Sequence, residues 1–141
     1  MPSGTIAIEQ VHPHLRLHEP TLRSLIRHVA AEEGGTLGTL TVVLADHETV
    51  LTLNRTYLDH DYITDVLAFD LSDTPDRLDG EIYVDLDTAA ERHDEFGATF
   101  EDEALRYVVH GLLHLLGYDD DSPAGKAAMR RLENEYLAAI R

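Results

Sequence analysis

Two histidines one helical turn apart are the residues of this sequence best suited to chemistry. His110 and His114 lie four positions apart in the apolar run EDEALRYVVHGLLHLL, residues 101–116. Imidazoles at this spacing share a helix face and can converge on one metal ion, because their Cβ atoms are about 6 Å apart. Gly117 permits the left-handed residue that ends a helix, and Asp120 follows three positions later, so its carboxylate can return to the rings. The pattern predicts a zinc site of two histidines and one aspartate with one position open for water.

The same skeleton occurs in metzincin proteases, which place a glutamate directly after the first histidine as the general base. Here that position is Gly111, so the motif has no carboxylate there to activate water for peptide hydrolysis. A protease is therefore a poor interpretation. The alternative that both histidines are ordinary helix residues is also disfavoured, because their apolar neighbours would bury this helix and unpartnered imidazoles are costly in a core.

The acidic composition and the absence of cysteine restrict the kinds of site and partner that the chain can have. It has 141 residues and a formal charge of −16, with 27 Asp plus Glu against 11 Lys plus Arg, and no Cys. A thiolate zinc site, a cysteine nucleophile and a disulfide scaffold are therefore excluded. The charge is the opposite of the basic surface expected of a nucleic-acid-binding protein. Two interpretations of this charge fit the composition equally well: adaptation to a high-salt cytosol, and an ordinary acidic protein.

The length and the hydropathy predict a single cytoplasmic domain over residues 1–141. A chain of this size buries about two-thirds of its unfolded surface in one core, so folding requires no metal or disulfide. The N-terminal region lacks the basic start and apolar core of a secretory signal, and no apolar run approaches the roughly 20 residues that span a bilayer. We therefore expect no membrane partner.

Strands and helices that alternate along the chain must position these residues. Residue patterns predict strands over 5–9, 40–45, 65–69 and 81–84, and helices over 21–33, 87–96, 101–116 and 123–140. A further helix is expected to begin after its cap, Asp46, and to bury Val50, Leu51, Leu53 and Tyr57. This order predicts an α/β (α+β) fold, in which a small mixed sheet of about four strands packs with five or so helices. The metal site would lie on a central helix of the C-terminal half.

Several segments resemble the YbeY family of metal-dependent endoribonucleases. The run HGLLHLLGYD at 110–119 resembles the signature of that family, and LNRTY at 53–57 and TDVLAF at 64–69 resemble its LNxxY and TDVLSF segments. Gly80-Glu81-Ile82 is similar to a later strand of the family, and Met129 and Glu133 match its closing pattern. The resemblance covers about residues 40 to 137.

This resemblance implies a zinc-dependent endoribonuclease that acts in ribosomal RNA maturation and ribosome quality control. The implied substrate is single-stranded RNA near the end of the small-subunit species, on the ribosome or a precursor of it. The implied partners are the small ribosomal subunit, its proteins and a ribosome-associated GTPase.

Three departures from the family pattern bear on this expectation. Asp120 stands where the third metal ligand is usually histidine, and the resemblance carries that role to it. Leu58 stands where the family has an arginine implied in RNA binding or catalysis, so the most obvious phosphate contact is missing. Ala68 and Asp70 replace the Ser and Pro of TDVLSFP. Leu58 and the acidic charge together keep open a second function. The chain would then be a non-catalytic or weakly catalytic ribosome-assembly factor that binds ribosomal partners and has a structural metal.

Other polar residues are open to more than one interpretation. Asp65, Asp119 and His60 are the candidates to carry the proton in hydrolysis. His12, His14 and His18 could form a second metal site, but no acid cluster lies near them, and we expect a solvated loop. The segment DLSDTPDRLDG at 70–80 lacks calcium-loop spacing and is interpreted as an acidic surface loop.

Overall fold

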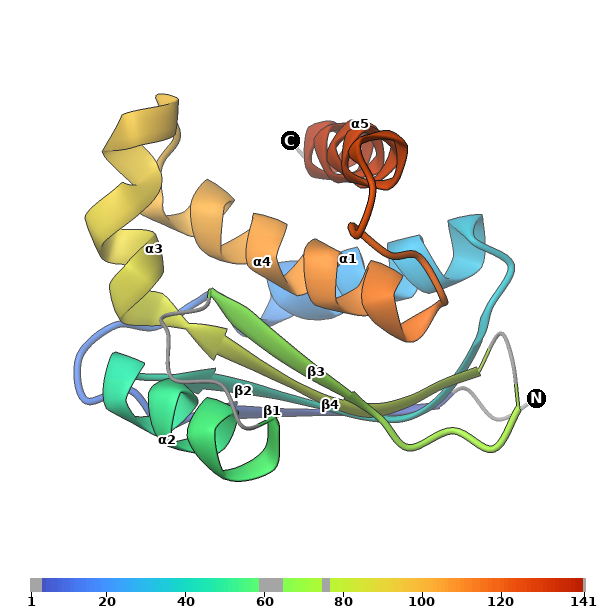
Figure 1. Cartoon of the computed structure of the whole chain (residues 1–141), viewed down its shortest axis with the longest axis horizontal. Helices are drawn as coiled ribbons and strands as arrows, with labels where there is room; N and C mark the ends of the chain where they lie inside the picture. The colour runs from blue at the N-terminus through green and yellow to red at the C-terminus, as the bar shows by residue number, and fades with distance from the viewer. Residues whose placement is uncertain (1–3, 59–64, 75–76, 141) are drawn as a thin grey trace.

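The computed structural model describes residues 4–58, 65–74 and 77–140, in which a central sheet carries helices on both faces (Figure 1). Its strands are β1 (Thr5–Gln10), β2 (Thr36–Ala45), β3 (Val66–Asp70) and β4 (Arg77–Asp85). Its helices are α1 (Glu19–Glu32), α2 (His47–Leu58), α3 (Leu86–Arg92), α4 (Phe100–Leu115) and α5 (Pro123–Ala139), with a 3-10 turn over His93–Phe96. The expected α/β fold with a small mixed sheet is confirmed.

The sheet has the strand order β1-β2-β4-β3. Strands β1, β2 and β4 run parallel to one another, and β3 pairs antiparallel with β4 at one edge. One row across the sheet joins Ile8 of β1, Val42 of β2, Ile82 of β4 and Ala68 of β3. Parallel strands need a crossover connection, and α1 supplies it between β1 and β2.

Helix α4 is the central buried helix of the fold. It lies with α1 on one face of the sheet, α5 packs on the outer side of α4, and α2 covers part of the opposite face (Figure 1). Val108, Val109, Leu112 and Leu113 have no exposed surface. Burial of each such side chain contributes about 1.5–3 kcal/mol, so this helix is held firmly against the sheet. No helix among the described residues is both long and apolar enough to cross a membrane.

Gly111 lets α4 approach the sheet closely. A Cβ atom at this position would lie 2.9 Å from Ile82 Cγ2 and 3.3 Å from Val66 Cγ2. These methyl groups belong to branched side chains of the sheet and cannot easily move away. The residue after His110 therefore faces the core, and a glutamate there would be directed into the sheet, which agrees with the argument against a protease.

Two strands are longer than expected, because polar residues join the ladder before the apolar runs begin. β2 begins at Thr36 and β4 begins at Arg77, and these two residues are partners in the parallel pairing. The Asp79 carboxylate also accepts a hydrogen bond from the Thr39 backbone N–H across the two strands, at 2.6 Å. The interpretation of 70–80 as one long surface loop was therefore wrong, since its last residues belong to β4.

Two helix predictions also need correction. Asp46 caps α2 as expected, because the Thr49 N–H donates to its Oδ1 at 2.9 Å, and Val50 is buried. Tyr57, however, is 68% exposed, and Asn54 is buried instead, one turn after Val50. Only a narrow side of α2 contacts the sheet.

The helix expected over 87–96 divides after Arg92 into α3 and the 3-10 turn, which ends at Gly97 with φ 66°.

His12 is buried, and the expectation of a solvated loop was wrong for this residue. Its Nε2 lies 2.8 Å from Asp87 Oδ1, and its Nδ1 accepts the backbone N–H groups of His14 and Leu15 at 3.0 and 2.9 Å. The ring thus holds the turn after β1 against α3. His14 and His18 are exposed, as expected.

The substitution Gly111→Ala tests the close approach of α4 to the sheet. Alanine favours a helix by about 1 kcal/mol over glycine, but overpacking a core costs about 1–3 kcal/mol. We expect a lower free energy of unfolding in urea, by about 1 kcal/mol, with an unchanged m-value. A variant more stable than the parent would show that α4 has room for a methyl group here.

Candidate metal centre

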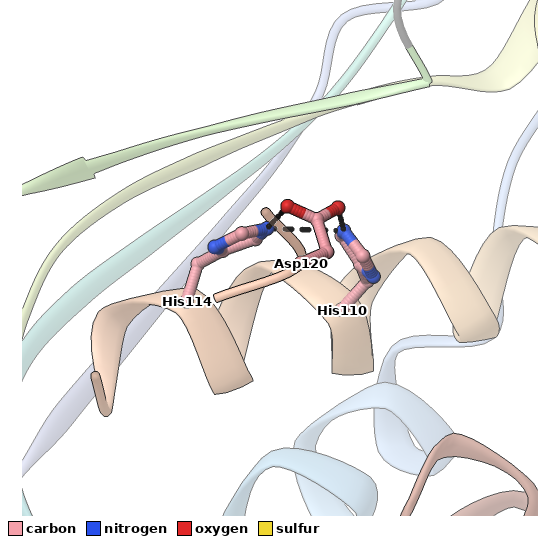
Figure 2. Close-up of side chains that lie close together, drawn as sticks. All are labelled: His110, His114 and Asp120. Carbon is pink, nitrogen blue, oxygen red and sulfur yellow. Dashed lines mark hydrogen bonds and ion pairs between the residues drawn. The ribbon is translucent and has the colours of Figure 1, made fainter. Parts of the chain in front are cut away.

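The end of α4 turns the chain back toward its own histidines. Gly117 has φ 102°, in the left-handed region that its sequence position predicts. Its N–H donates to the His114 carbonyl at 3.1 Å, and the Tyr118 N–H donates to the Leu113 carbonyl at 3.0 Å. These bonds satisfy the last carbonyls of the helix, and the reversed chain brings Asp120 over the two rings (Figure 2).

His110, His114 and Asp120 can hold a metal ion. Each offers one ligand atom, and these atoms all lie within 4.8 Å of one another. His110 Nε2 is 3.1 Å from His114 Nε2, and the two Asp120 oxygens lie 3.4 Å from His110 Nε2 and 3.8 Å from His114 Nε2 (Figure 2). Ligand atoms about 2.0–2.1 Å from a tetrahedral ion are about 3.3 Å apart, so the spacing fits such an ion.

Glu133 of α5 orients the first histidine from behind. Glu133 is only 4% exposed, and its Oε2 lies 2.7 Å from His110 Nδ1. When Nδ1–H donates to this carboxylate, the lone pair of Nε2 faces Asp120, as a metal ligand requires. Arg106 of α4 donates to the other oxygen of Glu133 at 3.2 Å and compensates its charge.

The same contact controls the titration of His110. Burial opposes the protonated ring, but the hydrogen bond and charge of Glu133, with the charges of Asp65 and Asp120, raise its pKa above the ordinary 6.5. A proton on this ring competes with a metal ion, because only the neutral imidazole is a ligand.

Sequence reasoning noted Glu133 only as a match to a family pattern and missed its place in the site. The sequence nevertheless contains one indication that Glu133 is buried. Glu133 occupies the apolar side of α5, one turn after Met129 and one turn before Leu137, and all three are buried. A carboxylate in an apolar stripe needs partners in the core, and here they are His110 and Arg106.

A cleft of about 240 Å³ opens beside His110 and Asp120. Its lining residues come from α4, α5 and the segments before β3 and α5, and they are Asp65, Arg106, Tyr107, His110, Asp120, Lys126, Met129, Arg130 and Glu133. Burial raises the pKa of the Asp65 carboxyl, although the nearby His110 acts in the opposite direction. A carboxylate with a raised pKa can exchange a proton closer to neutral pH.

The structure separates the three candidates for proton transfer. Asp65 lines the cleft with His110. Asp119 is exposed, lies outside the lining of that cleft, and accepts the Asp121 N–H at 3.2 Å. His60 lies outside the described residues. Within those residues, the histidines of the N-terminal segment do not form a second group that could hold a metal.

Comparison with known proteins identifies one family over nearly the whole chain. The family model described as Endoribonuclease YbeY matches residues 7–141. A protein from Salinibacter ruber named Endoribonuclease YbeY is 55% identical over 143 aligned residues, covering 96% of this chain and 91% of that protein. One of the same name from Chlorobaculum tepidum is 38% identical, covering 89% and 90%. A solution structure from Thermotoga maritima, 31% identical, has a TM-score of 0.70 and covers 96% of this chain and 89% of that one.

The substitution Glu133→Gln tests whether this carboxylate supports metal binding. Loss of such a partner weakens metal affinity by about 10–100-fold while the direct ligands remain. We expect this loss for zinc in competition with a chromophoric chelator, with one ion still bound per chain at saturation. Glu135→Gln, an exposed position on the same helix, is the matched control and should bind as the parent does. Equal affinities of the two variants would contradict the role of Glu133.

The raised pKa of His110 predicts the pH dependence of metal binding. In the parent, zinc affinity should fall as the pH decreases through a value above 6.5, because His110 takes up a proton in the metal-free protein. Glu133→Gln removes the charge that favours this proton, so the fall should begin at lower pH. Chelator competition from pH 5 to 8 measures both profiles, and coincident profiles would refute the assignment.

Proposed function

The chain belongs to the YbeY family of endoribonucleases, and we propose that it is a zinc-dependent endoribonuclease that cleaves single-stranded ribosomal RNA during small-subunit maturation and quality control. The observation that carries this proposal is the convergence of His110, His114 and Asp120 next to a cleft that is lined by His110, Asp120 and the Asp65 carboxylate. The names of the relatives support nuclease activity. The donor set of two imidazoles and one carboxylate supports zinc, which favours such ligands.

The chain's own residues can divide the work of phosphodiester hydrolysis among them. A zinc ion held by His110, His114 and Asp120 would lower the pKa of water and stabilise negative charge on a phosphoryl oxygen. Glu133 keeps Nε2 of His110 directed at the ligand position. We assign proton acceptance to Asp65, because it is the candidate that lines the cleft and its pKa is raised.

The surface charge bears on how the substrate reaches the site. A net charge of −16 repels free RNA at long range, although salt screens this repulsion beyond about 8–10 Å. We propose that the cytoplasmic ribosomal subunit or its precursor presents the RNA, already positioned by ribosomal proteins and with a ribosome-associated GTPase as a further partner.

A ribosome-assembly factor with a structural metal is the second candidate function. The acidic charge and Leu58 at the end of α2, in place of an arginine, favour it. It would be supported if the zinc-loaded parent left ribosomal RNA intact while the zinc-free protein still bound ribosomal particles.

The substitution Asp65→Asn tests the assigned proton acceptor. General bases contribute about 10²–10⁴-fold to a rate, so kcat on a single-stranded ribosomal RNA fragment should fall by about that factor, with zinc still bound at one ion per chain. Asp119→Asn makes the same change outside the cleft and should keep the parent rate. His114→Ala reports any contaminating nuclease. Equal rates for the two asparagine variants would remove Asp65 from this role.

A further inference from the structure

Two of the few basic residues of this acidic chain lie together at the candidate metal centre. Lys126 and Arg130 are exposed, lie four positions apart on α5, and line the same cleft as His110 and Asp120. Residues at this spacing lie on one side of a helix, about 6 Å apart. Lys126 is also the single lysine among the 141 residues.

Helix α5, which carries Lys126 and Arg130, is capped at its start and anchored by buried side chains. Ser122 caps the helix, since the Gly125 N–H donates to its hydroxyl at 3.0 Å. Met129 and Glu133 are buried beneath, and Glu133 binds two side chains of α4. The positions of both cations along α5 are therefore set relative to the metal ligands.

The charge of the cleft differs from the charge of the whole chain. Its lining contains three carboxylates and three cationic side chains, so it is formally neutral before any ion binds, whereas the chain has a charge of −16. Arg106 is 19% exposed as a side chain and compensates Glu133, whereas Lys126 and Arg130 are exposed to solvent. A divalent ion would add two positive charges. Because salt screens distant carboxylates, an anion at the cleft responds mainly to this local charge.

We propose that Lys126 and Arg130 bind backbone phosphates of the RNA strand on the α5 side of the metal centre. This inference rests on the proposed function, and it identifies a phosphate contact in the absence of the arginine that Leu58 replaces. Two cations one turn apart suit a ligand with repeated negative charges better than a single anion. Lysine provides a mobile point charge and arginine a planar pair of donors, and both are common phosphate contacts.

The test compares Lys126→Gln and Arg130→Gln with Arg131→Gln. Arg131 is the next residue on α5, is exposed, and is not part of the cleft lining, so this variant makes the same charge change elsewhere. Fluorescence anisotropy of the zinc-loaded proteins with a 2′-O-methyl single-stranded RNA, checked on a gel to remain intact, gives Kd over a range of KCl. Each cleft variant should weaken binding about tenfold at low salt and reduce the slope of log Kd against log salt by about 0.7.

Conservative variants and a competitor complete the test. Lys126→Arg and Arg130→Lys should restore most of the affinity, which a merely structural role would not predict. Equal affinities and slopes for the three glutamine variants would overturn the proposal. So would equal competition by an oligoglutamate peptide of the same length, since the site would then bind acidic chains in general.

Cleavage measured on the same proteins distinguishes this inference from the proposed function. If the parent cleaves RNA and the cleft variants bind as Arg131→Gln does, the phosphate contact is wrong and the nuclease stands. If the parent does not cleave, but its binding depends on Lys126 and Arg130, the contact stands and the nuclease is wrong.

Discussion

The buried carboxylate of Glu133 is the constraint on which the candidate site depends. A carboxylate in a core is costly unless it is paired and hydrogen-bonded, and removal of one partner of such a pair costs about 3–5 kcal/mol. Both partners of Glu133, His110 and Arg106, belong to α4. This carboxylate therefore joins α5 to α4, together with the apolar packing of Met129 and Leu137, and it sets the direction of the histidine ring. The same helix brings Lys126 and Arg130 to the cleft.

A second set of His–Asp contacts lies at the ends of the strands, away from the candidate site on α4. In sheets with parallel strands, ligands commonly bind beyond the carboxyl ends of the strands. Here those ends are occupied by internal contacts. His47 Nδ1 lies 2.8 Å from Asp85 Oδ2, Asp85 also caps α3, and His12 contacts Asp87. These groups join the ends of β1, β2 and β4 to α2 and α3. His110 and His114, by contrast, remain half-buried, and His110 lines a cleft.

The overall charge and the local charge of this protein have different consequences. The charge of −16 governs solubility and long-range encounter, and it disfavours attraction of free RNA. The cleft lining balances its carboxylates with cations, so a bound divalent ion would make it positive. An acidic endoribonuclease of this family is thus compatible with an anionic substrate, provided that contact is made at short range.

The proximity of the three candidate metal ligands and the main elements followed from the sequence because their signals are local. Helical spacing places His110 beside His114, and Gly117 determines the turn that returns Asp120, all within eleven residues of chain. Long apolar runs likewise marked the strands and α4. The buried side of α2 was mistaken at Tyr57, since hydropathy alone does not reveal how little of a helix touches the sheet. The contacts of Glu133, the cleft position of Asp65 and the position of Lys126 and Arg130 beside His110 join distant segments. Only tertiary packing decided these, because side-chain chemistry depends on neighbours that the order of residues does not specify.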